Sequence, residues 1–354
     1  VNQVSGEPTG EKAKIQIMEG MDPIETHLPV LEDVNHPLVP ETNHQYILRE
    51  IKGMTDLELV SYVIEDEDFF VIAEGEAGVG KNMCFSVLAE AANWPARRVN
   101  FGMGTTYSNL VGRYTPIDNE DTEQETVDRV EAVRNTALRL CEQHDEVEMG
   151  KALELASHSI PNGNSYAWMD GILTKAVKYG WWFIADEINA ADDSAIMPLN
   201  GLTEDRDSRY LTIEEKSEVI DPHPRFRFLA TRNPAGYKGV GEQNEALESR
   251  GYIVPFDHLP DEAEISILQN RTNIIENESE KAAKALVKLV SNVRQQEQSG
   301  NDIMTKVSTR DLIKIGKLTD IMGIREAAEL IFEGISNDED FDSLKEELKG
   351  TKFE

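Results

Sequence analysis

The chain has 354 residues, and its 66 Asp and Glu outnumber its 35 Lys and Arg, which gives a formal charge of −31 at pH 7. Such an acidic surface opposes non-specific binding to nucleic acid. Two cysteines exclude a disulfide framework, and no apolar run approaches the roughly 18 residues of a membrane span. We therefore expect a cytoplasmic protein of two or three domains, or of one large domain with a lid, with no membrane partner and with nucleic acid disfavoured as a partner.

The acidic residues are spread along the whole chain, from Glu7 to Glu354, rather than gathered in one tail. Adaptation to a saline, halophilic environment would explain an even spread, because excess carboxylates keep a surface hydrated. A basic partner is the alternative explanation. Net charge bears on solubility and association and not on fold, so the even spread favours the first explanation and leaves the second open.

The beginning of the chain is polar and rich in proline. Residues 1–40 contain five prolines and no sustained periodicity, which predicts an extended or partly disordered lead-in. Residues 55–65 predict a helix, because Thr55 can cap it and Glu58 follows three residues later. The apolar run 69–73 then predicts a buried strand.

A glycine-rich segment follows this strand and opens a helical pattern, which is the context that a phosphate-binding loop requires. Its glycines let backbone N–H groups surround phosphate oxygens, and the following helix adds its positive end. The last position of the pattern, normally Ser or Thr, is Asn, whose amide oxygen can still be a neutral ligand for Mg²⁺. The predicted nucleotide-binding residues are Gly75, Glu76, Ala77, Gly78, Val79, Gly80, Lys81 and Asn82.

The next segments alternate between strand, loop and helix. Residues 98–101 predict a second strand, and residues 109–114 a loop and turn. Residues 117–164 are acidic with recurring apolar positions, which indicates a helical insertion into the domain.

The second strong signal is the run 181–187, which is apolar until it ends in Asp186 and Glu187. A parallel strand buried on both faces has this continuous apolar character, and ligands bind at the carboxyl ends of such strands. We predict that Asp186 holds Mg²⁺ and that Glu187 polarises the water that attacks a phosphate.

Polar residues also end or follow later predicted elements. A helix is expected at 192–203, a hairpin at 210–220, and strands at 226–231 and 252–256. Asn233 follows the first of these strands and could orient the attacking water. From Pro260 onward the pattern is helical, and Ser308 or Thr309 caps a helix near Arg310.

The order of these motifs resembles that of AAA+ ATPases. The phosphate loop, Asp186-Glu187, the stretch 230–234 that contains Asn233, then Arg250, and finally Ser308-Thr309-Arg310 follow one another in the same order. Within that family the chain looks most like the MoxR branch, especially the CobS subunit of aerobic cobaltochelatase and the CbbQ/NirQ activators. The resemblance covers residues 40–335, and the shared phrases include 93–95 and 219–227.

This resemblance implies an α/β fold, a P-loop parallel sheet flanked by helices, with a C-terminal helical lid. The α/β domain would span 41–258 and the lid 259–335, and the pattern of the remaining residues, 336–354, predicts an acidic amphipathic tail that forms a short helix. It also implies ATP and Mg²⁺ as cofactors and a ring, usually a hexamer.

The resemblance assigns a role to each site residue. Lys81 would bind the β- and γ-phosphates, Asp186 would serve Mg²⁺, and Glu187 would activate water. Asn233 corresponds to sensor 1 and Arg310 to sensor 2. Arg250 would be the arginine finger that acts on a neighbouring subunit's ATP, since its planar, permanent charge matches phosphate oxygens.

Three functions remain open at this point. The first is an ATP-hydrolysing remodelling or chaperone-like motor that acts on a client or adaptor protein, for which a protein with a von Willebrand A domain is one candidate. The second is a nucleotide-binding scaffold with weak or no hydrolysis, which Asn82 suggests. The third is a DNA-associated motor, which the missing basic stripe disfavours.

Overall fold

The computed structural model describes residues 3–17, 22–32, 35–42, 46–66, 69–116, 166–234, 249–298 and 304–353, with isolated positions between 131 and 153 and residue 247. The chain divides into two compact units. The larger unit comprises Val1–Thr105, Lys175–Thr212 and Val219–Glu354, and the smaller comprises Thr106–Thr174 and Ile213–Glu218. No helix in the described ranges is long and apolar enough to cross a bilayer.

The larger unit is built on a five-stranded sheet whose order is β13-β5-β12-β9-β6, and every pair of neighbours is parallel. Its strands are β5 (Val71–Glu74), β6 (Ala96–Asn100), β9 (Trp182–Asp186), β12 (Arg227–Arg232) and β13 (Tyr252–Pro255). The first three residues of β5 and the first four of β9 are buried, as expected for strands with both faces covered. The predicted α/β fold with a parallel sheet is confirmed, and the carboxyl ends of β5, β9 and β12 meet at one edge.

Helix α1 (Asp56–Glu65) shows how local sequence positions an element. Thr55 is its N-cap, and its hydroxyl accepts a hydrogen bond from the Glu58 N–H at 3.1 Å. This confirms the predicted helix and its cap, because capping depends on residues adjacent in sequence. Helix α2 (Lys81–Ala91) begins directly after the glycine-rich loop.

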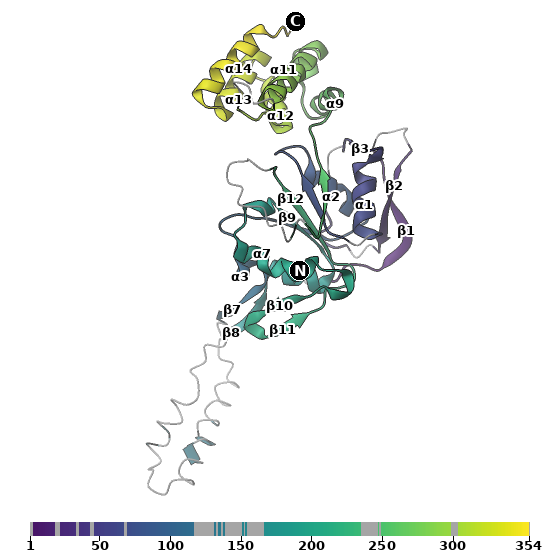
Figure 1. The fold of residues 1–354 in the computed structure, drawn as a ribbon, viewed down its shortest axis with the longest axis vertical. Coiled ribbons are helices and arrows are strands. Elements are labelled where there is room, and N and C mark those ends of the chain that lie inside the picture. The colour runs from purple at the N-terminus through teal and green to yellow at the C-terminus, as the bar shows by residue number, and fades with distance from the viewer. Residues whose placement is uncertain are drawn as a thin grey trace. The chain divides into compact units, whose positions relative to one another are not determined.

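The first 40 residues differ from the expected extended or partly disordered lead-in. They contain β1 (Pro8–Ile15) and β2 (Ile24–Leu31), which pair as an antiparallel ribbon. Ala13, Leu28 and Leu31 are fully or almost fully buried in the same core as α1 and α2. The β1–β2 ribbon, purple to dark blue in Figure 1, therefore lies beside α1, where it covers apolar surface of the domain.

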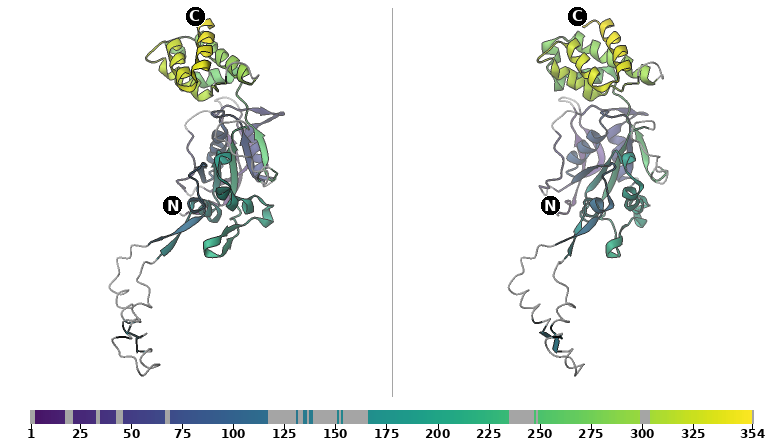
Figure 2. Two further views of the ribbon diagram at one scale, coloured as in Figure 1. Left: turned by 60° about the vertical axis from the view of Figure 1, so that its left-hand side comes forward. Right: turned by 90° about the vertical axis from the view of Figure 1, so that its left-hand side faces the viewer.

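The C-terminal part of the chain is a cluster of helices with its own apolar core (Figures 1 and 2). It comprises α9 (Asp261–Arg271), α10 (Ile274–Asn277), α11 (Glu280–Gln298), α12 (Thr309–Leu318), α13 (Ile324–Ile335) and α14 (Asp338–Gly350). The short amphipathic helix expected in the acidic tail at 336–354 is present as α14, and the structure adds that Leu344 and Leu348 of this helix are buried in the core of the helical cluster. Asp338, Glu339, Asp342 and Glu346 are exposed on the other side of this amphipathic helix, whereas Asp340 is buried and accepts a hydrogen bond from the Thr305 hydroxyl.

The smaller unit contains α3 (Tyr107–Leu110), β7 (Gly112–Pro116) and β8 (Tyr166–Asp170), and β7 pairs with β8 in antiparallel register. Residues 109–114, expected as a loop and turn, instead end a helix capped by Thr106 and begin a strand. The predicted helical insertion at 117–164 lies outside the described residues, apart from isolated positions.

The predicted hairpin at 210–220 is confirmed as β10 (Leu211–Ile213) and β11 (Glu218–Ile220). The predicted helix at 192–203 corresponds to α7 (Asp193–Asn200) and a short 3₁₀ segment after it. The remaining elements are β3 (Glu50–Ile51), β4 (Met54–Thr55), α6 (Ile172–Tyr179), and the 3₁₀ segments Ile188–Ala190, Gly201–Thr203, Arg206–Ser208 and Glu214–Lys216.

Candidate functional site

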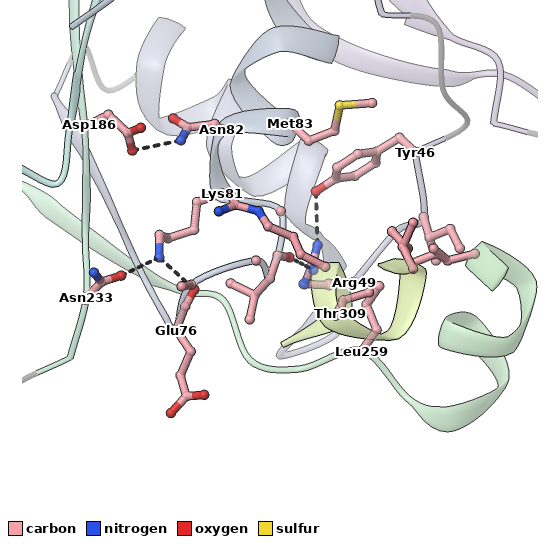
Figure 3. A pocket seen from close by; sticks show the side chains of 18 of the residues that line it. Tyr46, Arg49, Glu76, Lys81, Asn82, Met83, Asp186, Asn233, Leu259 and Thr309 are labelled. Atoms are coloured by element: carbon pink, nitrogen blue, oxygen red, sulfur yellow. Dashed lines mark hydrogen bonds between the residues drawn. The ribbon is translucent and has the colours of Figure 1, made fainter. Parts of the chain in front are cut away.

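A cavity of about 380 Å³ opens at the edge of the sheet where β5, β9 and β12 end (Figure 3). Its walls come from the glycine-rich loop, the ends of β6 and β9, Asn233 after β12, and the helices α9 and α12. Predicted site residues from separate segments of the chain line it: all of the predicted loop residues from Glu76 to Asn82, together with Asp186, Glu187, Asn233 and Arg310.

The glycine-rich loop takes a backbone conformation that other residues rarely adopt. Gly78 and Gly80 have φ angles of 85° and 97°, in the left-handed region. A β-carbon on Gly78 would also lie 3.0 Å from the Ser308 Cβ. Glycine at these positions therefore lets the loop curl tightly before α2, with backbone N–H groups and the positive end of the helix at the cavity.

Lys81 is almost fully buried at the start of α2, with 7% of its surface exposed. Its Nζ donates to the Gly75 carbonyl, to the Glu76 carbonyl at 2.9 Å and to Asn233 Oδ1 at 3.1 Å. Burial lowers the pKa of Lys81 to about 8, against the opposing pull of the nearby Asp186 and Glu187 carboxylates. The ammonium group is thus held by weak acceptors that a stronger anion could replace.

Asn82 and Asp186 face each other across the cavity wall (Figure 3). Asn82 Nδ2 donates to Asp186 Oδ1 at 2.8 Å. Asn82 Oδ1 is buried and has no hydrogen-bond partner within the part of the chain that the structure describes. An unpartnered amide oxygen beside a carboxylate is a donor set that fits Mg²⁺, which prefers oxygen ligands and keeps several waters. No group of three His, Cys, Asp or Glu side chains in the described ranges is placed to bind a metal alone.

Thr231, which sequence reasoning did not single out, connects the two carboxylate residues. Its hydroxyl donates to Asp186 Oδ1 at 2.5 Å and accepts from the Glu187 N–H at 3.0 Å. Glu187 has a φ angle of 55°, which a non-glycine residue adopts only where its surroundings hold it. The hydroxyl therefore fixes the turn that presents Glu187 to the cavity. The only sequence signal was the position of Thr231 at the end of β12.

Asn233 lies between the loop and β9. Its side-chain oxygen accepts from Lys81, and its backbone carbonyl accepts from Asn189 Nδ2 at 3.0 Å. These two contacts hold the amide at the inner end of the cavity, as Figure 3 shows for the bond to Lys81.

The two arginines selected from the sequence have different positions. Arg310 lines the cavity, and its Cγ lies 3.4 Å from the β-carbon position of Gly78 in the loop. Arg250 is not among the described residues that line the cavity. Its guanidinium instead pairs with Glu204 at 3.0 Å and donates to the Asn200 carbonyl at 3.4 Å.

A second residue that sequence reasoning missed is Arg49, which supports the loop from behind. It donates to the Val79 carbonyl, and to the Asp257 carbonyl at 3.4 Å. Its charge is balanced by Asp56, a fully buried carboxylate 3.4 Å away that also accepts from the Tyr46 hydroxyl. No local motif marks Arg49, because all of these partners except Tyr46 and Asp56 are distant in sequence.

Comparison with known protein families identifies the family in which this arrangement occurs. Residues 71–156 and 151–251 match the AAA domain family (dynein-related subfamily). The chain belongs to this family. Residues 264–348 of this AAA+ ATPase match the C-terminal domain of the CbbQ/NirQ/NorQ proteins, and the two matches together are a MoxR-like signature. The second match includes most of α14, in agreement with its place in the helical core.

Individual relatives of this AAA+ ATPase have low sequence identity to it or match only part of the chain. Midasin of Dictyostelium discoideum is 31% identical over 152 residues, which are 42% of this chain and 2% of midasin. An uncharacterized protein of Staphylococcus saprophyticus is 24% identical over 80% of this chain and 89% of its own length. A crystal structure of a candidate ATPase from Cytophaga hutchinsonii is 17% identical, with a TM-score of 0.36 over 78% of this chain and 75% of that chain.

Proposed function

We propose that this AAA+ ATPase binds ATP in the cavity at the end of the sheet, hydrolyses it with Mg²⁺ and uses the cycle to remodel a partner protein as a ring of subunits. The observation that carries the proposal is the convergence of Lys81, Asn82, Asp186, Glu187, Asn233 and Arg310 on one cavity beside a glycine-rich helix N-terminus. Such convergence of phosphate-binding and carboxylate groups supports phosphoryl-transfer chemistry.

In this proposal the loop binds the phosphates. Backbone N–H groups of 75–82 and the N-terminus of α2 meet the negative charge, and Lys81 exchanges its carbonyl acceptors for phosphate oxygens. Arg310, from the other wall of the cavity, meets the outer phosphate.

The metal would be held by Asn82 Oδ1 and the Asp186 carboxylate, together with waters and the nucleotide. Mg²⁺ when bound supplies positive charge that neutralises the phosphates. Thr231 keeps the Asp186 carboxylate in place. Glu187 accepts the proton of the attacking water, and Asn233 orients that water.

The remodelling role is supported by the match to the CbbQ/NirQ/NorQ C-terminal domain. Wild-type protein should release phosphate from ATP in the presence of Mg²⁺ at high salt. Binding of ATP without any phosphate release would instead support the nucleotide-binding scaffold. Co-purification from the native host, followed by identification of the partner protein, tests the remodelling role.

The lowered pKa of Lys81 predicts a pH-dependent affinity for nucleotide. Phosphate binding requires the charged ammonium, and the free protein loses that charge as pH rises through about 8. Above this pH, Lys81 must take up a proton when nucleotide binds. The affinity for nucleotide should therefore be at its full value near pH 7 and about tenfold weaker at pH 9. Titration of a fluorescent ATP analogue at constant ionic strength measures this. The phosphates, with a pKa near 6, are already ionised over this range.

The control is Lys81→Arg, whose guanidinium stays charged and whose affinity should not vary over this pH range. Wild-type affinity that is unchanged between pH 7 and pH 9 would show that Lys81 does not meet the phosphates.

Asn82→Thr tests the metal ligand. A hydroxyl would replace the unpartnered amide oxygen and remove the competing bond from Asn82 Nδ2 to Asp186. We expect the half-saturating Mg²⁺ concentration for phosphate release to fall by up to about tenfold. Affinity for ATP in EDTA should stay the same, which is the control. If the Mg²⁺ titration of the variant overlays that of wild type, residue 82 is not at the metal.

A further inference from the structure

Glu76, the second residue of the glycine-rich loop, binds two basic side chains from other parts of the chain. Its Oε2 accepts from His258 Nε2 at 3.0 Å, and its Oε1 accepts from Lys306 Nζ at 3.0 Å. His258 lies between β13 and α9, and Lys306 lies just before α12. Lys306 also pairs with Glu297 of α11 at 3.3 Å. One loop carboxylate thus connects the loop to the segment before the helical cluster and to the start of α12.

These contacts are shielded from water more than ordinary surface ion pairs. The side chains of Glu76, His258 and Lys306 are 20%, 15% and 34% exposed. Hydrogen bonds from His258 and Lys306 lower the pKa of Glu76 to about 2, so the carboxylate is ionised at every working pH.

The same segment carries Arg310. Ser308, two residues after Lys306, caps α12 in a reciprocal pair with Asp311, which makes the first turn of the helix rigid. This turn lies against the loop, with Ser308 Cβ 3.0 Å and Arg310 Cγ 3.4 Å from the β-carbon position of Gly78. The anchor at Lys306 and the guanidinium of Arg310 are thus joined by a short, capped piece of chain.

We infer that Glu76 is a positioning residue, which through Lys306 and His258 holds Arg310 over the outer phosphate of a bound nucleotide. The inference rests on the proposed function, because it takes Arg310 to contact that phosphate. In this inference the Glu76 carboxylate acts through its two basic partners, while only the backbone N–H of Glu76 faces the phosphates.

A simpler role makes the opposite prediction. Glu76 is close enough for its charge to be felt at Lys81. If it were only a negative charge near the phosphates, its removal would relieve repulsion and tighten the binding of both ATP and ADP. If Glu76 positions Arg310, its removal should weaken the binding of ATP. The binding of ADP, which lacks the outer phosphate, should stay nearly unchanged.

The experiment measures the dissociation constants of ATP and ADP for wild type, Glu76→Gln, Lys306→Met, Arg310→Ala and the double variant Glu76→Gln/Arg310→Ala. We expect Glu76→Gln and Lys306→Met each to weaken the affinity for ATP by between about threefold and thirtyfold, and to change the affinity for ADP by less than about twofold. In the Arg310→Ala background, Glu76→Gln should cost no more than about twofold, because the residue it positions is gone. Lys284→Met, which breaks an exposed pair with Glu280 on α11, is the matched control and should change neither constant.

Each other outcome has a distinct meaning. Unchanged or tighter ATP binding by Glu76→Gln, an equal loss for ATP and ADP, or a full additional loss in the double variant overturns the inference. If Arg310→Ala does not weaken the binding of ATP more than that of ADP, the role assigned to Arg310 is wrong, and this inference is wrong with it. Thermal melting checks that each variant is folded. If Glu76→Gln is unstable, Lys306→Met tests the same network by removing the partner of the Glu76 carboxylate.

Discussion

Glu187→Gln should bind ATP as wild type does and release phosphate about 10²–10⁴-fold more slowly, the usual cost of losing a general base. The structure presents this side chain to the cavity at the end of β9, on a turn whose N–H is held by Thr231. The glutamine side chain keeps the size of Glu187 and the conformation of the turn, but its amide cannot accept a proton from water. Single-turnover phosphate release and ATP affinity, measured on the same preparation, separate chemistry from binding.

Asp193→Asn is the matched control for this variant. It neutralises an exposed carboxylate in the first turn of α7, outside the cavity, and should leave phosphate release unchanged. A Glu187→Gln protein that retains wild-type turnover would assign the base to another residue. Equal loss in the control would mean that acidic charge in general, and not Glu187, supports the reaction.

Arg250→Ala should bind ATP normally and lose about 10³–10⁵-fold in hydrolysis, the range known for arginines supplied by a neighbouring molecule. Within one chain its guanidinium contacts Glu204 and the Asn200 carbonyl and does not line the cavity. In the proposed ring, the contribution of Arg250 to hydrolysis therefore comes from a second subunit. Specific activity should rise with protein concentration as rings form.

Mixing two inactive variants tests this directly. Arg250→Ala subunits retain an intact cavity, and Lys81→Ala subunits retain the arginine, so mixed rings should recover part of the phosphate release. Arg209→Ala is the matched control, because Arg209 Nε donates to the Glu204 carbonyl at 3.0 Å, in the same segment that holds Arg250. Light scattering confirms assembly. Mixed rings without recovery, or a fully active Arg250→Ala protein, would exclude Arg250 as the arginine supplied in trans.

Features that depend on neighbouring residues were predictable from the sequence. The Thr55 cap, the continuous apolar strand β9 and the loop-to-helix transition at Lys81 each follow from a few adjacent side chains. The parallel sheet was expected from the continuous apolar run of β9 and from the resemblance to AAA+ ATPases. The grouping of Asp186 and Asn233 near Lys81 followed in turn, since parallel strands end at the same edge.

What could not be predicted depends on distant partners. The β1–β2 ribbon has only a few inward residues, among them Ala13 and Leu28, so its prolines and polar positions hid its periodicity. The sequence predicted a short amphipathic helix at α14 but not its packing, because the acidic residues outnumber the two leucines, Leu344 and Leu348, that contact distant helices. Arg49 had no recognisable pattern, because its role depends on the Val79 carbonyl 30 residues away.

The strand order has a consequence for how the protein reaches its native state during synthesis. Strand β5, which leads into the glycine-rich loop, pairs with β12 and β13, whose residues follow only at 227–232 and 252–255. A nascent chain that has emerged only as far as β9 therefore holds β5 without either of its neighbours. Pairings this distant in sequence are slow to close, and an unpaired apolar strand is prone to aggregate in the meantime. The nucleotide site can thus be completed only after β12, β13 and the segment that carries Arg310 have left the ribosome, and until β12 and β13 follow, β5 remains an unpaired apolar strand.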